Sequence, residues 1–137
     1  MSNFIEIFRY PAKFTRIEPN YGHVTTDYLN RNSQHPLDGV TGGEARIKAT
    51  YEAIRAAPLW ASSLLIITWD EHGGFYDHVR PPGGAVKPGD QPAFAGANRY
   101  GFPFTPYGPR VPAVVISRLI PANTIDHRIY DHSWGIA

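Results

Sequence analysis

Residues 63–78 read SLLIITWDEHGGFYDH, and this stretch decides the fold. Its first part, residues 63–69, is a largely apolar run that is too short for a helix and rich in strand-forming side chains. A run without alternating polar residues indicates a strand buried on both faces, as in a parallel sheet. A second run of this kind, VPAVVIS, covers residues 111–117. We therefore expect core strands at residues 64–68 and 114–116.

A helix is expected before the first strand, at about residues 43–57. Apolar residues recur there at helical spacing: Ile47, Tyr51 and Ile54. Thr41 and Glu44 fit a capping box with Thr41 as the N-cap, and Pro58 closes the pattern. The two apolar runs are separated by residues 71–110, which hold more than half of all the Gly and Pro in the chain. A connection this long predicts a functional loop in an α/β fold.

Composition narrows the class of protein. The chain has 137 residues, of which 42% are hydrophobic, so it can bury a core and is not a disordered chain. The net charge of +1 with scattered Arg and Lys argues against a nucleic-acid partner. The lack of Cys excludes disulfides, thiolate metal ligands and cysteine nucleophiles. No run approaches the roughly 20 apolar residues of a transmembrane segment, and residues 1–14 lack the pattern of a signal peptide, which leaves the localisation open.

Acidic and histidine side chains are concentrated directly after the first expected strand. Residues 70–78 hold five of them: Asp70, Glu71, His72, Asp77 and His78. Ligands of open α/β sheets bind at the carboxyl ends of strands, and a carboxylate pair can hold a divalent cation there. Two other interpretations remain open at this point. The segment could be a carboxylate–histidine acid/base pair, or a strand-end Asp that caps the following turn.

Residues 66–79, IITWDEHGGFYDHV, resemble the signature of the bacterial and fungal phosphoesterase family that contains phospholipases C and an acid phosphatase. The resemblance extends over roughly residues 14–133. The flanking segments that share it are SQHP at 33–36, GE at 43–44, YEAIR at 51–55, YGPRVPAVVIS at 107–117 and YDHS at 130–133.

The resemblance implies a partial alkaline-phosphatase-like fold, an α/β three-layer sandwich with a mostly parallel sheet. It also implies hydrolysis of phosphate esters, including the headgroup ester of phospholipids, with a bound divalent metal ion of unknown identity. Asp70 and Glu71 correspond to the metal-ligand pair. His35 and His132 fall where the family has active-site histidines, which would contact the phosphate or stabilise the leaving oxygen.

Several other residues of these segments allow two interpretations. Asp77 and His78 either form a turn that supports the site or contact the ligand directly. Arg110 either faces a phosphate or is a structural arginine. His127 is the alternative to His132. His72 is either solvated or loop-stabilising, or it takes part in the site. Phe75 and Tyr76 are expected to pack in the core or the loop, with a lipid-binding surface as the alternative.

The chain also departs from the family. Members are considerably longer, and their metal-bound hydroxyl nucleophile lies upstream of every segment matched here. We therefore expect residues 1–137 to be one partial domain, the C-terminal part of a catalytic domain truncated at both ends, with the N-terminal part missing. In one interpretation the chain carries the C-terminal half of the site of an active phosphoesterase. In the other it is an inactive fragment or a metal-binding remnant that lacks the nucleophile. The substrate, phospholipid or soluble phosphoester, stays open.

Overall fold

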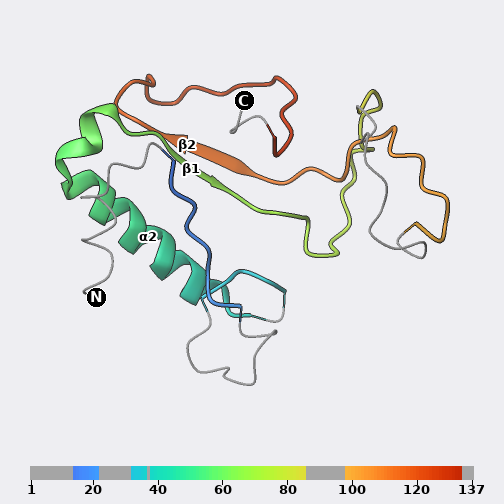
Figure 1. The fold of residues 1–137 in the computed structure, drawn as a ribbon, viewed down its shortest axis with the longest axis horizontal. Helices are drawn as coiled ribbons and strands as arrows, with labels where there is room; N and C mark the ends of the chain where they lie inside the picture. Colours follow the sequence, from blue (N-terminus) through green and yellow to red (C-terminus); the bar gives the residue numbers. More distant parts are fainter. Residues whose placement is uncertain (1–13, 22–31, 37, 86–97, 134–137) are drawn as a thin grey trace. The chain divides into compact units, whose positions relative to one another are not determined.

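A computed structural model of the chain describes residues 14–21, 32–36, 38–85 and 98–133. The elements in these ranges are a helix, a 3-10 helix and two strands: α2 (Val40–Ala56), η2 (Pro58–Ser62), β1 (Leu65–Thr68) and β2 (Ala113–Ile116) (Figure 1). The chain divides into two compact units. The first contains residues 1–68 and 113–137, and the second contains residues 69–112. Residues 1–13, which include most of the stretch tested for a signal peptide, lie outside the described ranges.

Helix α2 confirms the helix expected from the apolar spacing, but it begins earlier. Its N-cap is Gly39, whose backbone is extended and which makes no side-chain cap hydrogen bond. The capping box assigned to Thr41 is therefore wrong, because Thr41 already lies inside the first turn. That turn is closed by the backbone, where Gly42 N–H donates to the Gly39 carbonyl at 3.2 Å. None of the helices described here is long and apolar enough to cross a lipid bilayer.

The two expected strands form a sheet, and they pair antiparallel. Leu65 lies opposite Ile116, and Thr68 lies opposite Ala113. The expectation of a mostly parallel sheet is therefore wrong for the part of the chain that the structure describes. The expectation failed because a continuous apolar run carries no information about strand direction, and mixed sheets also contain antiparallel pairs. A three-layer sandwich is not seen among the described residues, which form one helix beside a two-stranded sheet.

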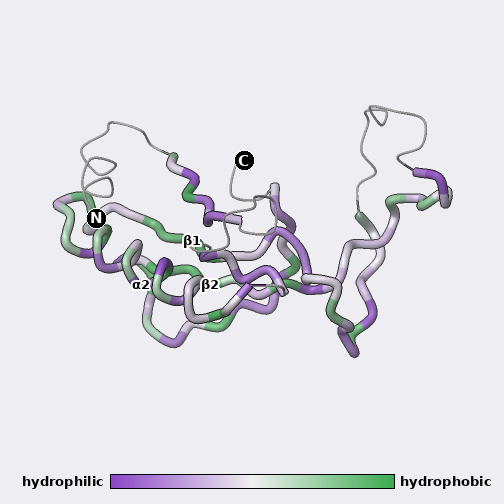
Figure 2. Tube along the Cα trace, turned by 90° about the horizontal axis from the view of Figure 1, so that it is seen from below, coloured by the Kyte–Doolittle hydropathy of each residue, from purple (hydrophilic) through white to green (hydrophobic). Residues whose placement is uncertain are grey.

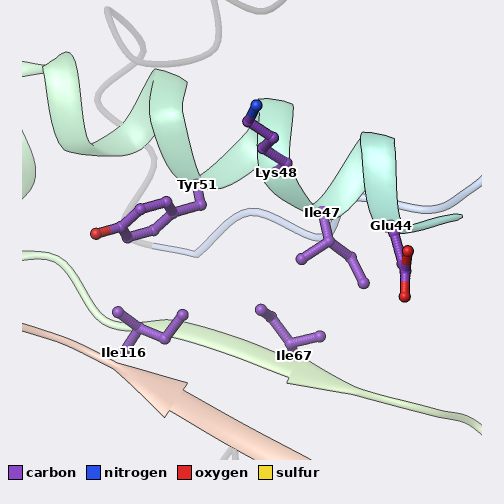
Figure 3. Close-up of a pocket in the computed structure, with 6 residues that line it drawn as sticks. All are labelled: Glu44, Ile47, Lys48, Tyr51, Ile67 and Ile116. Carbon is purple, nitrogen blue, oxygen red and sulfur yellow. The ribbon is translucent and has the colours of Figure 1, made fainter. Parts of the chain in front are cut away.

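One face of this sheet turns toward α2. Ile47 and Tyr51 of the helix point toward Ile67 and Ile116 of the strands and line an apolar groove with them (Figure 3). The helix suits this position because hydrophobic and hydrophilic residues alternate along it (Figure 2). Among the described apolar side chains only Ile54 is buried, with 8% of its surface exposed. The core of the first unit is therefore small and lies between helix and sheet.

The other sheet face is exposed, which differs from the expected burial on both faces. Side chains at alternate positions of the first strand region, Leu64 and Ile66, are 54% and 39% exposed. Val115, which lies opposite Ile66 on this face, is also exposed, and so is Val114 on the face toward α2. Burial therefore alternates along β1, although hydrophobicity does not.

Backbone pairing joins two described parts of the second unit, residues 82–85 and 105–107. Gly83 and Pro106 form an antiparallel bridge. Tyr107 N–H donates to the Pro82 carbonyl at 2.9 Å, and Ala85 N–H donates to the Thr105 carbonyl at 3.0 Å. These contacts bring two separate parts of the Gly- and Pro-rich segment side by side.

Candidate functional site

The acidic pair begins the second unit. Asp70 and Glu71 follow Thr68, the last residue of β1, after a single tryptophan, and both are exposed. Glu71 Oε2 accepts a hydrogen bond from Gly73 N–H at 2.9 Å and lies 3.6 Å from His72 Nδ1. One carboxylate oxygen of Glu71 is thus oriented by its own turn. Both carboxylates are accessible to a ligand from solvent.

Two glycines form the turn after this pair. Gly73 and Gly74 have φ angles of 67° and 73°, and Phe75 N–H donates to the His72 carbonyl at 3.2 Å. A turn with two successive left-handed residues strongly favours glycine at both positions, because a Cβ is strained there. The glycine pair therefore lets the chain reverse immediately after the acidic residues. The packing expected for Phe75 and Tyr76 is not seen, because these side chains are 68% and 92% exposed.

Asp77 and Arg110 form a two-pronged ion pair within the second unit. Arg110 Nε donates to Asp77 Oδ2 at 2.9 Å, and Arg110 Nη2 donates to Asp77 Oδ1 at 3.0 Å. Val79 N–H also donates to Asp77 Oδ1, at 3.0 Å. The hydrogen bonds from Arg110, followed by the one from Val79, hold the pKa of the Asp77 carboxyl well below its usual range. The structural interpretation of Arg110 is favoured, because two of its three guanidinium nitrogens already bind a carboxylate.

His35 lies in a tight turn before α2. Its backbone N–H donates to Ser33 Oγ at 3.4 Å, and Asp38 N–H donates to the His35 carbonyl at 2.7 Å. Ser33 Oγ in turn donates to Asp38 Oδ2, and Ser33 is only 3% exposed. These contacts fix the backbone of His35, whose side chain is half-buried.

His132 lies in an exposed turn that is stabilised by its neighbours. Asp131 Oδ1 accepts hydrogen bonds from Ser133 N–H at 2.9 Å and from Ser133 Oγ at 2.5 Å. The alternative, His127, adjoins a different cluster, in which Asp126 binds Arg128 and also accepts a 2.7 Å hydrogen bond from Tyr130. The hydrogen bond from Arg128 lowers the pKa of the Asp126 carboxyl, and this carboxylate is already paired with an arginine.

The four predicted site residues are divided between the two units. Asp70 and Glu71 belong to the second, whereas His35 and His132 belong to the first. Within the described ranges, no three side chains of His, Asp or Glu lie close enough together to hold a metal ion. Two adjacent carboxylates are nevertheless the oxygen donors that Mg²⁺, Mn²⁺ and Ca²⁺ prefer. Asp70 and Glu71 therefore fit part of a metal-ligand set.

Sequence reasoning missed the contact between Asp77 and Arg110. The signal that could have found it is the placement of opposite charges beside the two strand runs. This signal can be used only if the strands are assumed to be antiparallel. The end of the first strand then lies beside the start of the second, so Asp77, which follows the first, and Arg110, which precedes the second, are on the same side.

Comparisons with known proteins agree with the resemblance found from the sequence. The model of the Phosphoesterase family matches residues 5–136. The chain is 44% identical over 114 residues to non-specific phospholipase C4 of Arabidopsis thaliana, covering 80% of this chain and 21% of that protein. It is 40% identical over 111 residues to non-specific phospholipase C3 of the same plant, covering 81% of this chain and 20% of that protein.

A bacterial relative shows the same partial coverage. The chain is 30% identical over 117 residues to the non-hemolytic phospholipase C of Burkholderia pseudomallei (strain K96243), covering 74% of this chain and 16% of that protein. The chain thus spans about a fifth of the length of the curated relatives that it matches.

Proposed function

Because this chain belongs to the Phosphoesterase family, we propose that it forms part of a hydrolase site that cleaves phosphate ester bonds. The observation that supports this most strongly is the position of Asp70 and Glu71, exposed and adjacent directly after a strand, inside the segment that the family model matches. The relatives named above are phospholipases C, so we propose a phosphoester substrate that includes the headgroup ester of a phospholipid. A soluble phosphoester is the alternative.

The acidic pair would hold the divalent cation. A cation at this position supplies a Lewis acid that offsets the negative charge of the phosphoryl group during displacement. Asp70 and Glu71 contribute the carboxylate oxygens, and the exposed position of both side chains leaves room for a phosphate group beside them. We propose that further ligands of the cation come from residues outside this acidic pair.

The two histidines would serve the leaving group. In the net reaction the bond between phosphorus and the leaving oxygen breaks, a water oxygen takes its place on phosphorus, and the leaving oxygen receives a proton. An imidazole carries its protons on ring nitrogens that can donate, so His35 or His132 can give this proton or a hydrogen bond to the leaving oxygen. We place no nucleophile on the strand region, because Ser62 and Ser63 both direct their hydroxyls to the Leu59 carbonyl, at 3.3 and 2.7 Å.

The first test measures binding. The purified 137-residue chain is titrated with Mn²⁺ by calorimetry, and then with inorganic phosphate in the presence of Mn²⁺. We expect weak Mn²⁺ binding that promotes phosphate binding, and we expect Asp70→Asn and Glu71→Gln to abolish both. Glu52→Gln is the matched control, because Glu52 is an exposed acid on α2 whose side chain is 62% exposed. A chain that binds neither ligand, or that binds both equally well after Asp70→Asn, contradicts the proposal.

The second test measures turnover. Hydrolysis of p-nitrophenyl phosphate reports soluble phosphoesters, and headgroup release from phosphatidylcholine vesicles reports lipid substrates. We expect little turnover by the 137-residue chain alone, because the site residues proposed here include no nucleophile. Ready hydrolysis that is lost in Asp70→Asn would show a self-sufficient site, and the preferred substrate would then identify the class. Binding without turnover agrees with a partial site, as in the metal-binding remnant considered above.

A further inference from the structure

The acidic pair lies on a segment that is bounded by an ion pair. Along the sequence, residues 69–76 begin directly after β1 and end just before Asp77. On the returning chain only Val111 and Pro112 separate Arg110 from the start of β2. Asp77 thus follows the segment that carries Asp70 and Glu71, and Arg110 lies just before the second strand in sequence. The contact between them joins these two points of the chain.

This contact is more strongly built than an ordinary surface ion pair. The guanidinium binds both carboxylate oxygens, which fixes the relative orientation of the two planar groups as well as their distance. The Asp77 side chain is only 17% exposed, although that of Arg110 is 58% exposed. The backbone hydrogen bond from Val79 holds the carboxylate from a second direction. Further along, the Gly83–Pro106 bridge keeps the same two arms together.

The segment between Glu71 and Asp77 needs such a restraint. It contains Gly73 and Gly74, and glycine has more conformational freedom in a loop than any other residue. A loop that must become ordered when it binds a ligand loses affinity through the entropy of ordering. Fixing one end of the segment in advance reduces this loss.

We propose that Asp77 and Arg110 are positioning residues that hold the segment carrying Asp70 and Glu71 in its binding conformation. This inference rests on the proposed function for the acidic pair. It differs from a direct role of Arg110 on the phosphate, since the guanidinium acts here on Asp77 and not on the ligand. The two roles predict different Mn²⁺ affinities and exchange rates for a variant in which the acid and the arginine exchange positions.

The experiment uses the 137-residue chain and the variants Asp77→Asn, Arg110→Gln and the double variant. Mn²⁺ affinity is measured by calorimetry, and hydrogen exchange of the amides in residues 70–76 is followed by mass spectrometry. We expect each single variant to weaken Mn²⁺ binding by roughly 10-fold and to speed exchange in this segment. The double variant should be no worse than either single variant, because the two side chains act through one contact.

Two further variants separate positioning from other roles. The reversed pair, Asp77→Arg with Arg110→Asp, should recover part of the Mn²⁺ affinity and of the exchange protection. The matched control is Asp126→Asn, which removes a carboxylate from a comparable arginine contact in the first unit. It should leave both the Mn²⁺ affinity and the hydrogen exchange of residues 70–76 unchanged.

The outcomes are distinct. Unchanged exchange of residues 70–76 in both Asp77→Asn and Arg110→Gln would overturn the positioning role. Loss of phosphate binding in Arg110→Gln, with Mn²⁺ affinity and exchange intact, would also overturn it and assign Arg110 to the phosphate. If the unaltered chain binds no Mn²⁺, the proposed function of the acidic pair fails. The exchange measurement would then still decide whether the ion pair restrains the segment.

Discussion

The side chain of Gln34 lies directly over Gly43 in α2, where a Cβ on residue 43 would overlap the Gln34 Cγ atom. Gly43 is buried, although it lies in the first part of a helix. Because Gly43 has no side chain, the preceding turn, which also contains His35, can approach the helix closely at this point. Through this contact, the turn that contains this candidate histidine packs against the first part of α2.

Gly43→Ala tests this contact. Alanine favours a helix over glycine by up to about 1 kcal/mol, yet we expect the substitution to destabilise the chain by about 1–3 kcal/mol through overpacking. Urea unfolding monitored by circular dichroism measures the effect. The double variant Gln34→Ala with Gly43→Ala removes the overlapping atoms and should recover most of the lost stability. An increase in stability for Gly43→Ala alone would contradict the close approach.

Gly74→Ala tests the turn after the acidic pair. The φ of Gly74 is 73° and nothing lies within 4 Å of an added Cβ, so the effect is conformational strain and not a clash. We expect a loss of about 1 kcal/mol in unfolding free energy, measured by urea unfolding with tryptophan fluorescence. Gly83→Ala is the control, because its Cβ also meets nothing within 4 Å and its φ is not positive. Equal effects of the two substitutions would contradict the strain.

The Asp77 carboxyl predicts a pH dependence. Its pKa in the folded chain is depressed, mainly by the hydrogen bonds from Arg110. The resulting stabilisation is therefore fully present above the pKa of about 4 that an unperturbed Asp has, and it is lost as the pH falls toward the folded value. The stability difference between the unaltered chain and Asp77→Asn should be constant at neutral pH and shrink below about pH 4. Urea unfolding across this pH range measures it, and a difference that grows on acidification would contradict the sign.

Ser117 tests the link between the two strands. Its Oγ donates to the Ser63 carbonyl at 2.8 Å, and it also accepts a hydrogen bond from Leu119 N–H at 3.2 Å. Ser117→Ala should lower the free energy of unfolding by about 1 kcal/mol, because the half-buried carbonyl loses its donor. Ser62→Ala is the control, since this exposed hydroxyl makes only a 3.3 Å contact within its own 3-10 helix. An equal loss in both variants would argue against a specific role of the contact between Ser117 and Ser63.

Local patterns predicted one helix and both strands of the first unit, but not the 3-10 helix η2. The spacing of Ile47, Tyr51 and Ile54 identified α2, and the two apolar runs identified β1 and β2 within one or two residues. The start of α2 was predicted less well. Thr41 and Glu44 have the residue types of a capping box, but the extended backbone of Gly39 begins the helix earlier.

Long-range relationships were harder to predict. Strand direction depends on how residues 69–112 return, and periodicity within a strand carries no information about that path. The position of the acidic pair after β1 follows from the sequence, because Asp70 and Glu71 adjoin the strand. The partner of Asp77 does not, since Arg110 is 33 residues away and oppositely charged residues are common in any chain. The histidine assignments came from the family resemblance, and they remain predictions.

The pairing of β1 with β2 also has a consequence for how this chain folds. Its register joins Thr68 to Ala113, so the sheet can form only after residues 69–112 have closed into a loop. Closing a long loop has an entropic cost that a local helix does not have, and contacts between distant residues slow folding. Helix α2 and the adjoining η2 involve near neighbours only and are expected to form first. The segment that carries the acidic pair lies inside this loop, so it is expected to become ordered together with the sheet and after α2, and the carboxylates take their positions only in that later step.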